Sequence, residues 1–269
     1  MSKISVTTIA GLTSGGDANK VKIETGDDLE VVNGDLTVDT NTLHVSSSSD
    51  RVGIGTTSPS YPLTISHATT AYHHSTNGTA QSVSGVDSAN TNIIGTISNH
   101  DLRFITNTTE RGRITADGHF TQPSQPSFRV GGNNANWVSV TSGNTSIIEF
   151  DGNVYHNVGS HYSTTNDRFV APIAGRYLIG FHAYVRNNAA ASDGTSAYGY
   201  VRLYKNGGQL SSLNHIFGYA NHTDNDIQMS LQTVVELAAN DYMQVALSGI
   251  GGTVQHYGSA SEFYGHLLG

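Results

Sequence analysis

The sequence has 269 residues and a formal net charge of −8, and charged residues make up only 13% of it, well below the roughly 25% typical of globular proteins. No stretch gathers Lys and Arg, so nucleic-acid binding is not expected, because such an interface needs clustered cations to displace counterions. There are no cysteines, which excludes a disulfide framework, a zinc–thiolate site and a cysteine nucleophile.

The N-terminal segment, residues 1–25, is expected to attach the chain to a larger assembly. Its first twenty residues lack the apolar core of a signal peptide, and no apolar run in the chain approaches the roughly 20 residues of a membrane-spanning helix. We therefore expect synthesis in a cytoplasm, without membrane insertion. The apolar side chains expected to make the attachment are Ile4, Val6, Ile9 and Leu12.

A short internal repeat follows in residues 21–45. Three apolar pairs recur at a seven-residue interval: Leu29 with Val31, Leu36 with Val38, and Leu43 with Val45. A coiled coil also repeats every seven residues, but positions i and i+2 lie about 200° apart on a helix, whereas they share one face of a strand. The residues between the pairs, such as Asn33-Gly34-Asp35, are typical of turns. The repeat therefore predicts short strands joined by tight turns.

Each repeat unit has too small a core to fold alone. It buries two apolar side chains, which cannot offset the cost of ordering its backbone at roughly 1–2 kcal/mol per residue. Such units need copies to pack against, either neighbouring repeats or other chains. We therefore expect residues 26–122 to form an elongated β stalk built from three chains.

Further strand signals continue this stalk. Leu102–Phe104 and Arg113–Thr115 have strand character, and Asp117-Gly118 between strand residues is typical of a hairpin turn. Residues 67–100 are polar, with one apolar island at Ile93-Ile94.

Residues 123–269 are expected to form a separate domain, because Pro123 and Pro126 interrupt any strand and aromatic residues become frequent after them. Three segments alternate apolar and polar residues with a period of two, and a fourth strand follows; these are residues 176–185, 197–205, 227–237 and 242–248. Turn signals separate the segments, and none has a helical period. The pattern predicts an all-β fold with an antiparallel sandwich or barrel here.

Five short motifs occur in order along this domain. They are Phe150 with Asn157-Val-Gly159, Phe169 to Tyr177 with Pro172 and Gly175, Leu203-Tyr-Lys-Asn-Gly207, Leu237 with Asn240-Asp241, and Phe263-Tyr-Gly-His-Leu-Leu268. Together they resemble the C1q and tumour-necrosis-factor family, although Asn240 stands where glycine is usual. The resemblance implies a C1q-like jelly-roll sandwich of ten strands, a non-covalent homotrimer, and recognition without catalysis.

Two upstream motifs point to a second family. Arg51–Pro59 followed by Leu63–Ile65, and Leu102–Phe104 followed by Arg113–Gly118, resemble bacteriophage fibre proteins. The combined resemblance implies a structural fibre on the exterior of a phage particle, assembled in the host cytoplasm. The N-terminal segment would bind a tail, adaptor or capsid protein, and the C-terminal head would contact a host-surface glycan or protein. Attachment to the tail and attachment to the head of the phage both stay open.

Two rival functions are weighed against the fibre. A secreted C1q-like lectin or adhesin is opposed by the absent signal peptide and by the fibre motifs. A polysaccharide-degrading tail spike would need two carboxylates about 5–9.5 Å apart. Of the two pairs, Glu149/Asp151 lies beside a turn glycine, and Asp224/Asp226 is typical of a solvated loop in which calcium is conceivable. We expect no enzyme activity.

Receptor binding is expected in exposed loops at one end of the head. The candidate loops are Asn187–Tyr198, Phe217–Asp226 and Gly251–Ser259. Aromatic rings with polar neighbours suit stacking on sugars. The candidate residues are Tyr198, Tyr219, His222, His256 and Tyr257. The alternative is that these tyrosines pack at the trimer interface or on the sheet.

No cofactor or metal site is predicted. Gly53-x-Gly55 lacks a third glycine, a following helix and a nearby lysine, so a tight β-turn is expected instead of a nucleotide loop. The 13 His residues include no His-x-His pair. We expect them to be scattered over β-surfaces, although three copies of one His on a trimer axis could hold a metal ion.

Overall fold

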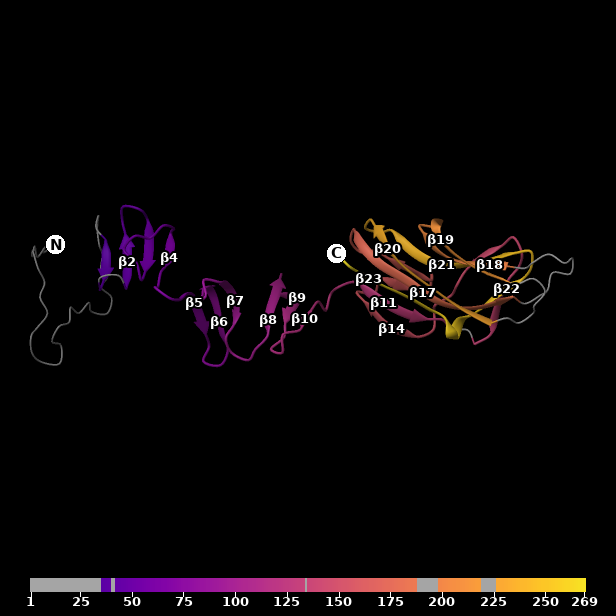
Figure 1. The fold of residues 1–269 in the computed structure, drawn as a ribbon, viewed down its shortest axis with the longest axis horizontal. Coiled ribbons are helices and arrows are strands. Elements are labelled where there is room, and N and C mark those ends of the chain that lie inside the picture. The colour runs from indigo at the N-terminus through magenta and orange to yellow at the C-terminus, as the bar shows by residue number, and fades with distance from the viewer. Residues whose placement is uncertain (1–34, 40–41, 134, 188–197, 219–225) are drawn as a thin grey trace, which may run out of the picture. The chain divides into compact units, whose positions relative to one another are not determined.

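β-Strands make up nearly all of the regular structure, which confirms the all-β prediction. The computed structural model describes residues 35–39, 42–133, 135–187, 198–218 and 226–269 (Figure 1). Within them the one helical element is a 3-10 turn, Gly258–Ala260, and no helix is long and apolar enough to cross a membrane. The chain divides into two compact units, Met1–Leu102 and Arg103–Gly269. The predicted attachment residues Ile4, Val6, Ile9 and Leu12 lie outside the described residues, and the division into segments 1–25, 26–122 and 123–269 stays a prediction.

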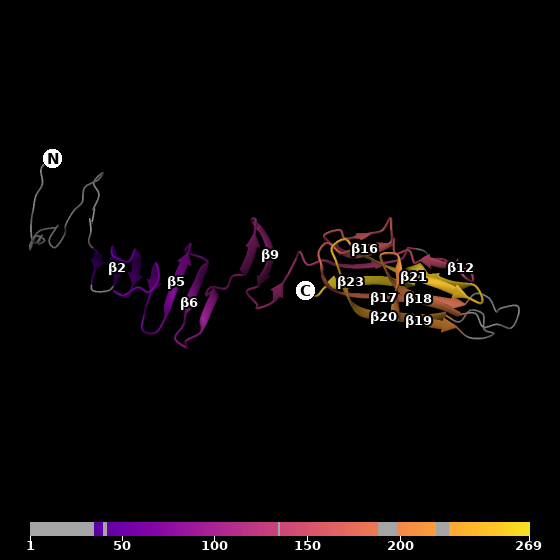
Figure 2. The same ribbon diagram turned by 90° about the horizontal axis from the view of Figure 1, so that it is seen from above.

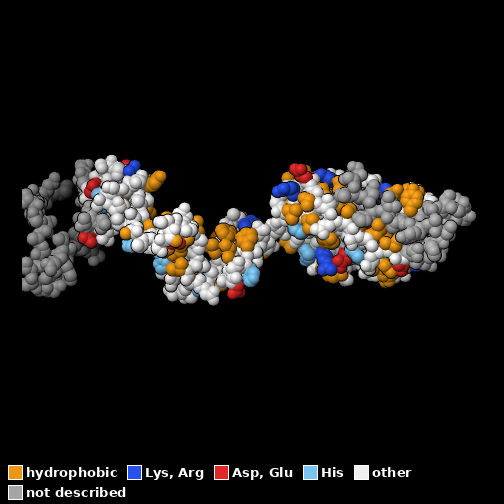
Figure 3. Space-filling view, in the orientation of Figure 1, with side chains coloured by type: hydrophobic (Ala, Val, Ile, Leu, Met, Phe, Trp, Pro, Cys, Tyr) orange, Lys and Arg blue, Asp and Glu red, His pale blue; other side chains and the backbone are white. Residues whose placement is uncertain are grey.

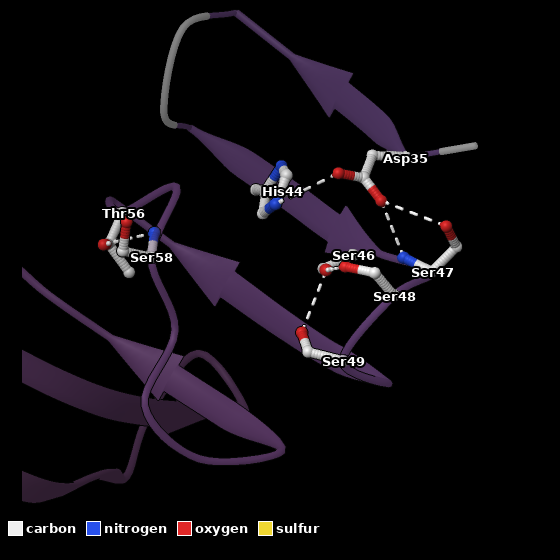
Figure 4. Close-up of polar contacts among 8 residues, drawn as sticks. All are labelled: Asp35, His44, Ser46, Ser47, Ser48, Ser49, Thr56 and Ser58. Atoms are coloured by element: carbon white, nitrogen blue, oxygen red, sulfur yellow. Dashed lines mark hydrogen bonds and ion pairs between the residues drawn. The ribbon is translucent and has the colours of Figure 1, made fainter.

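Two of the three repeat units form strands, and the first, Leu29 with Val31, lies outside the described residues. The first sheet has the order β1-β2-β3-β4, with β1 Leu36–Val38, β2 Leu43–Ser46, β3 Arg51–Ile54 and β4 Leu63–Ile65. Leu36 lies opposite Val45 in the antiparallel β1–β2 pair, so these two repeat units form strand, turn and strand. Asp35 fixes the end of this pair by accepting hydrogen bonds from the backbone nitrogen of Ser47 at 2.7 Å and from its hydroxyl at 3.2 Å (Figure 4).

The Gly53-x-Gly55 motif has a structural role. Gly55 adopts a φ of 76°, in the left-handed region that glycine tolerates best. A Cβ atom there would collide with the carbonyl oxygen of Ser66. Ser66 itself donates its backbone N–H to Ile54 at 2.8 Å. The motif therefore lets β3 approach the chain that follows the parallel strand β4. The predicted tight turn is wrong, because Gly53 lies within β3 and residues 55–62 connect β3 to β4.

The polar stretch after residue 67 also contains strands, which the sequence did not predict. β5 Ala71–Thr76, β6 Gln81–Val86 and β7 Asn92–Thr96 form an antiparallel sheet. Asp87 closes the β6–β7 turn, since its carboxylate accepts hydrogen bonds from the backbone nitrogens of Ala89 and Thr91, both at 2.9 Å. Hydrogen bonds of this kind, from a side chain to the nearby backbone, fix the turns in a segment that lacks an alternating apolar pattern.

The predicted hairpin near residue 117 is confirmed. β8 Leu102–Thr106, β9 Thr109–Ile114 and β10 Phe120–Thr121 form a sheet with the order β10-β9-β8. Gly118 donates its backbone N–H to Thr115 at 2.8 Å in the β9–β10 turn. Arg113 lies on β9 and makes two 2.6 Å hydrogen bonds to Glu110.

These three small sheets leave large apolar side chains in solvent. The most exposed include Ile94 at 77%, Ile105 at 61%, Phe120 at 60% and Leu63 at 57%. Figure 3 shows hydrophobic side chains at the surface along β5–β10. In a single chain, only Val83 among the apolar residues of β1–β10 is buried. The sheets therefore lack a core of their own, as expected from the small repeat units.

The C-terminal part is a sandwich of two antiparallel sheets, whose strands lie roughly along one common axis (Figures 1 and 2). The seven-stranded sheet contains β11 Ser127–Gly131, β12 Trp137–Val140, β14 Val154–Val158, β17 Gly175–Asn187, β20 Asp226–Leu237, β22 Val254–Tyr257 and β23 Glu262–Leu267. The six-stranded sheet contains β13 Thr145–Ile147, β15 Tyr162–Ser163, β16 Arg168–Val170, β18 Tyr198–Lys205, β19 Gly208–Gly218 and β21 Tyr242–Ile250.

One apolar core lies between these sheets, and the predicted alternation decides what enters it. On β17, Tyr177, Ile179, Phe181, Ala183 and Val185 are all 0% exposed. On β18, Val201 and Leu203 are 0% exposed, whereas Arg202 between them points outward. Phe128 stacks on Phe169 with ring centroids 4.7 Å apart. The predicted sandwich is confirmed.

Candidate functional site: two aromatic surfaces on the head

The structure separates the predicted receptor-binding residues. Tyr198 lies on β18 of the six-stranded sheet and Tyr257 on β22 of the seven-stranded sheet, so they do not share a site. Tyr219 and His222 lie outside the described residues. His256 is 1% exposed, because the alternation of β22 turns it into the sandwich. The prediction for His256 is therefore corrected: a side chain that is buried cannot contact a receptor.

His256 instead affects stability. Both of its ring nitrogens lack a hydrogen-bond partner, and burial lowers the pKa of His256 to about 4 from 6.5. Asp167 has the opposite effect, because burial raises the pKa of that carboxyl to about 6 even though it accepts a 3.0 Å hydrogen bond from the backbone nitrogen of Phe150. As the pH falls from 6.5 to 4, His256 destabilises the fold, since the unfolded chain binds the proton more readily. Ionised Asp167 also destabilises the fold, but this cost is relieved as the pH falls from 6 to 3.8, because the folded chain then binds the proton more readily.

We expect Asp167→Asn to expose the effect of His256. Asparagine keeps the acceptor for Phe150 and tolerates the φ of 47° at this position. The free energy of unfolding of the variant should fall by about 3 kcal/mol between pH 7 and pH 4, measured by urea denaturation. The double variant Asp167→Asn/His256→Leu should lose most of this dependence. An equal pH slope in both variants would contradict the assignment to His256.

The first aromatic surface lies on the outside of the seven-stranded sheet. Trp137 on β12 packs against Tyr184 on β17 and Tyr257 on β22, with ring centroids 5.4 and 5.2 Å apart. The guanidinium of Arg186 lies 4.0 Å from the centroid of the Trp137 ring and donates a 2.7 Å hydrogen bond to Gln255. The cluster thus joins three strands that are distant in sequence.

The same face carries a groove across β14, β11 and β23 with a volume of about 490 Å³. Arg129 crosses it to form a 2.9 Å ion pair with Glu262, and its guanidinium lies 4.6 Å from the centroid of the Tyr155 ring. Tyr155 is 53% exposed and Val234, on the other edge strand β20, is 53% exposed. This face therefore combines exposed apolar groups with paired charges, a composition suited to a protein interface.

The second aromatic surface lies on the outside of the six-stranded sheet. Alternation along β18 places Tyr198, Tyr200, Arg202 and Tyr204 on it. The rings of Tyr198 and Tyr200 are in edge contact with centroids 5.6 Å apart, and Arg202 stacks on Tyr200 at 3.9 Å. On the far side of β21, Arg168 stacks on Tyr242 at 4.7 Å. Of these residues the sequence interpretation had proposed only Tyr198, although the alternation in residues 197–205 already placed all four β18 residues on one face.

The described carboxylates of the two predicted pairs have structural contacts. Among the residues that the structure describes, no group of three or more His, Cys, Asp or Glu is placed to hold a metal ion. Glu149 and Asp151 lie near Asp167 and contribute to its raised pKa. Asp226 accepts a 2.8 Å hydrogen bond from the hydroxyl of Tyr184, which supports the first aromatic surface. Asp224 lies outside the described residues.

Comparisons with known proteins identify the sandwich. Residues 134–268 match the family model of the C1q domain. Among solved structures, the globular domain of zebrafish complement 1qA protein is similar at 15% sequence identity, with 54% of this chain and 98% of that chain covered and a TM-score of 0.35. No curated protein matches the chain. The matched residues include every strand from β12 to β23.

Proposed function

This chain belongs to the family of C1q-domain proteins, and from that premise we propose that it is a homotrimeric fibre of a bacteriophage particle whose head attaches the particle to its host. C1q domains serve binding and recognition, and they typically form trimers. The observation that carries the proposal is the series of small β-sheets with exposed apolar residues that precedes the C1q domain. These residues gain a core if three copies pack together.

The fibre motifs support this assignment. Arg51–Ile54 and Leu63–Ile65 form strands of one sheet, and Leu102–Thr106 and Thr109–Ile114 form strands of another. Ile105 and Phe120 on the latter sheet are at least 60% exposed, and burying each would contribute roughly 1.5–3 kcal/mol. Other copies of the chain can supply the matching surfaces, because identical chains aligned side by side place the same apolar side chains next to one another.

The outer face of the seven-stranded sheet is the proposed trimer interface of the head. Four of the six large apolar side chains exposed in the described part of the head, Val154, Tyr155, Val234 and Leu268, lie on this sheet or directly after it. The six-stranded sheet exposes only Ile250 among its described large apolar side chains. The Trp137 cluster and the groove then become part of the contact between copies.

Substituting Val234→Arg should break this contact. Val234 lies opposite Leu178 in the β17–β20 pair, so a charge there would be buried without a partner in the trimer. Light scattering should show the mass falling from about 85 kDa, three times the 28.5 kDa of the chain, toward that of the monomer. The matched control is Ile250→Arg, an exposed β-branched residue at the end of β21, which should remain trimeric. Equal masses for the two variants would contradict the proposed interface.

Two experiments test the biological role. Mass spectrometry of purified particles should detect the chain, and the purified full-length protein should bind host cells and compete with particle adsorption. A chain found instead on the surface of the producing cell would favour the C1q-like adhesin. Release of shortened glycans, abolished by Asp151→Asn or Asp226→Asn, would favour a polysaccharide-degrading spike.

A further inference from the structure

We propose that the outer face of the six-stranded sheet binds an anionic saccharide, with the guanidinium groups of Arg168 and Arg202 contacting its charged groups and the neighbouring tyrosine rings contacting its sugar rings. The inference rests on the proposed function, because it names the class of host-surface ligand that the head would recognise. The seven-stranded sheet would meanwhile be occupied by the other copies of the chain.

The strand register places the two arginines on either side of β21. Arg202 on β18 pairs with Ala246, which is 0% exposed. Phe169 pairs with Met243, so Arg168 lies one residue further along β16, beside Gln244. Gln244 is held by a 3.0 Å hydrogen bond from its side-chain nitrogen to the backbone oxygen of Asn166. Both side chains thus lie on the outer face of the sheet, with Arg168 stacked on Tyr242 and Arg202 stacked on Tyr200, which pairs with Ser248.

Both arginines are held in place but not neutralised. Each stacks on a tyrosine, Arg202 on Tyr200 and Arg168 on Tyr242, which fixes a planar guanidinium without using its in-plane donors. The Nε atom of each is buried and has no hydrogen-bond partner. By contrast, Arg113 is paired with Glu110 at 2.6 Å. Within the described residues, no ion pair is formed by either Arg168 or Arg202.

The charge distribution favours an anionic ligand. The six strands of this sheet contain no Asp or Glu, although the chain has 21 acidic residues and a net charge of −8. Their cations are Arg168, Arg202 and Lys205, and Lys205 is already paired with Asp241 at 2.8 Å. Two unpaired guanidinium groups can each bind a carboxylate, phosphate or sulfate in the bidentate manner that arginine favours.

A saccharide fits this surface better than other anionic partners. Two free cations are too few for nucleic acid, whose binding typically uses about 6–10 phosphate contacts. The described part of the face exposes one large apolar side chain, Ile250 at 38%, so it lacks the apolar centre of a protein interface. The face presents instead the rings and hydroxyls of Tyr198, Tyr200 and Tyr204, which can contact sugar C–H groups and hydrogen-bond sugar hydroxyls.

Binding of the full-length protein to immobilised polymers tests the proposal. The probes are polygalacturonate for carboxylate, phosphomannan for phosphate, dextran sulfate for sulfate, and neutral dextran. We expect at least one charged polymer to bind more tightly than neutral dextran, with an affinity that falls as salt is added. The preferred polymer identifies the charged group. Equal binding of all four, or binding of none, would overturn the inference.

The variants Arg168→Gln, Arg202→Gln and their combination locate the site. The double variant should lose at least tenfold in affinity for the preferred polymer, while Arg202→Lys, which keeps the charge but not the planar fork, should fall in between. Arg103→Gln is the matched control, because Arg103 is 62% exposed and the charge change is the same; its affinity should change less than twofold. A variant is included only if its mass by light scattering and the midpoint of its thermal melt equal those of the unmodified protein.

The outcomes separate this inference from the proposed function. A folded, trimeric double variant that keeps full affinity for the polymer would refute the site. If that variant still binds host cells, the fibre proposal would stand without the saccharide site. If the double variant binds the polymer tenfold more weakly than the unmodified protein, the saccharide site is supported. If mass spectrometry then finds no copy of the chain in phage particles, the fibre proposal is refuted and the site still stands.

Discussion

Deleting Phe263–Gly269 is expected to abolish folding of the head. These residues contain most of β23, which lies between β17 and β11 and pairs with both. The deletion removes the buried side chains of Phe263 and Leu267 and leaves two adjacent strands with unpaired backbone groups inside the sheet. Each such group costs about 1–3 kcal/mol when it is buried, so about five of them match the roughly 5–15 kcal/mol stability of a typical domain.

Circular dichroism and a thermal melt should show no cooperative transition of the head in the deletion variant. His266→Ala is the control, since His266 belongs to the same strand but is exposed, and its melt should be close to that of the unmodified protein. A deletion variant that remains a soluble trimer with a normal melt would show that β23 is not needed to complete the sandwich.

Phe128→Ala is expected to lower the free energy of unfolding by about 3–5 kcal/mol. Phe128 is 1% exposed and lies at the centre of the aromatic core. Its ring centroid is 4.7 Å from that of Phe169, 4.9 Å from Phe263 and 5.3 Å from Tyr162. Removing it leaves a cavity among rings that are fixed by both sheets, so the surroundings can close only partly.

Urea denaturation of the variant measures this loss. Ser127→Ala provides the comparison, because Ser127 precedes Phe128 on β11 but lies on the outer face beside His266; it should change the stability by less than about 1 kcal/mol. A loss below 1 kcal/mol for Phe128→Ala would show that the aromatic core can repack.

The head could be predicted from the sequence because its strands are long and alternate regularly. The alternate apolar residues from Tyr177 to Val185, and Val201 with Leu203, are buried as the pattern requires. A period of two lets a strand turn only one set of side chains toward one buried face. The short strands β12 and β22 were missed. Four residues such as Val254–Tyr257 contain too few alternations to reveal which side faces the core.

The position of His256 shows why the candidate site could not be read locally. Its orientation depends on pairing with Val138 and Val185, which are distant in sequence, and only those pairs turn the imidazole inward. The arginine pair has the same origin. Arg168 and Arg202 share one face because β16 and β18 both pair with β21, whereas the sequence shows two unrelated cations 34 positions apart.

In the upstream part, the sequence predicted strands where apolar pairs recur and missed them where polar side chains direct the fold. Leu36–Val38 and Leu43–Ser46 follow the repeat. Ala71–Thr76 and Gln81–Val86 contain mostly small and polar residues, and their turns depend on local hydrogen bonds such as those to Asp87. Ile94, on β7 of the same sheet, is 77% exposed.

The solution mass of the full-length chain, compared with the chain lacking residues 127–269, tests the central proposal most directly. A trimer of about 85 kDa, three times 28.5 kDa, that dissociates when the head is removed would agree with a fibre held together by its C1q domain. A stable full-length monomer would contradict it, because the sheets upstream of the head would then have no partner for their exposed apolar side chains.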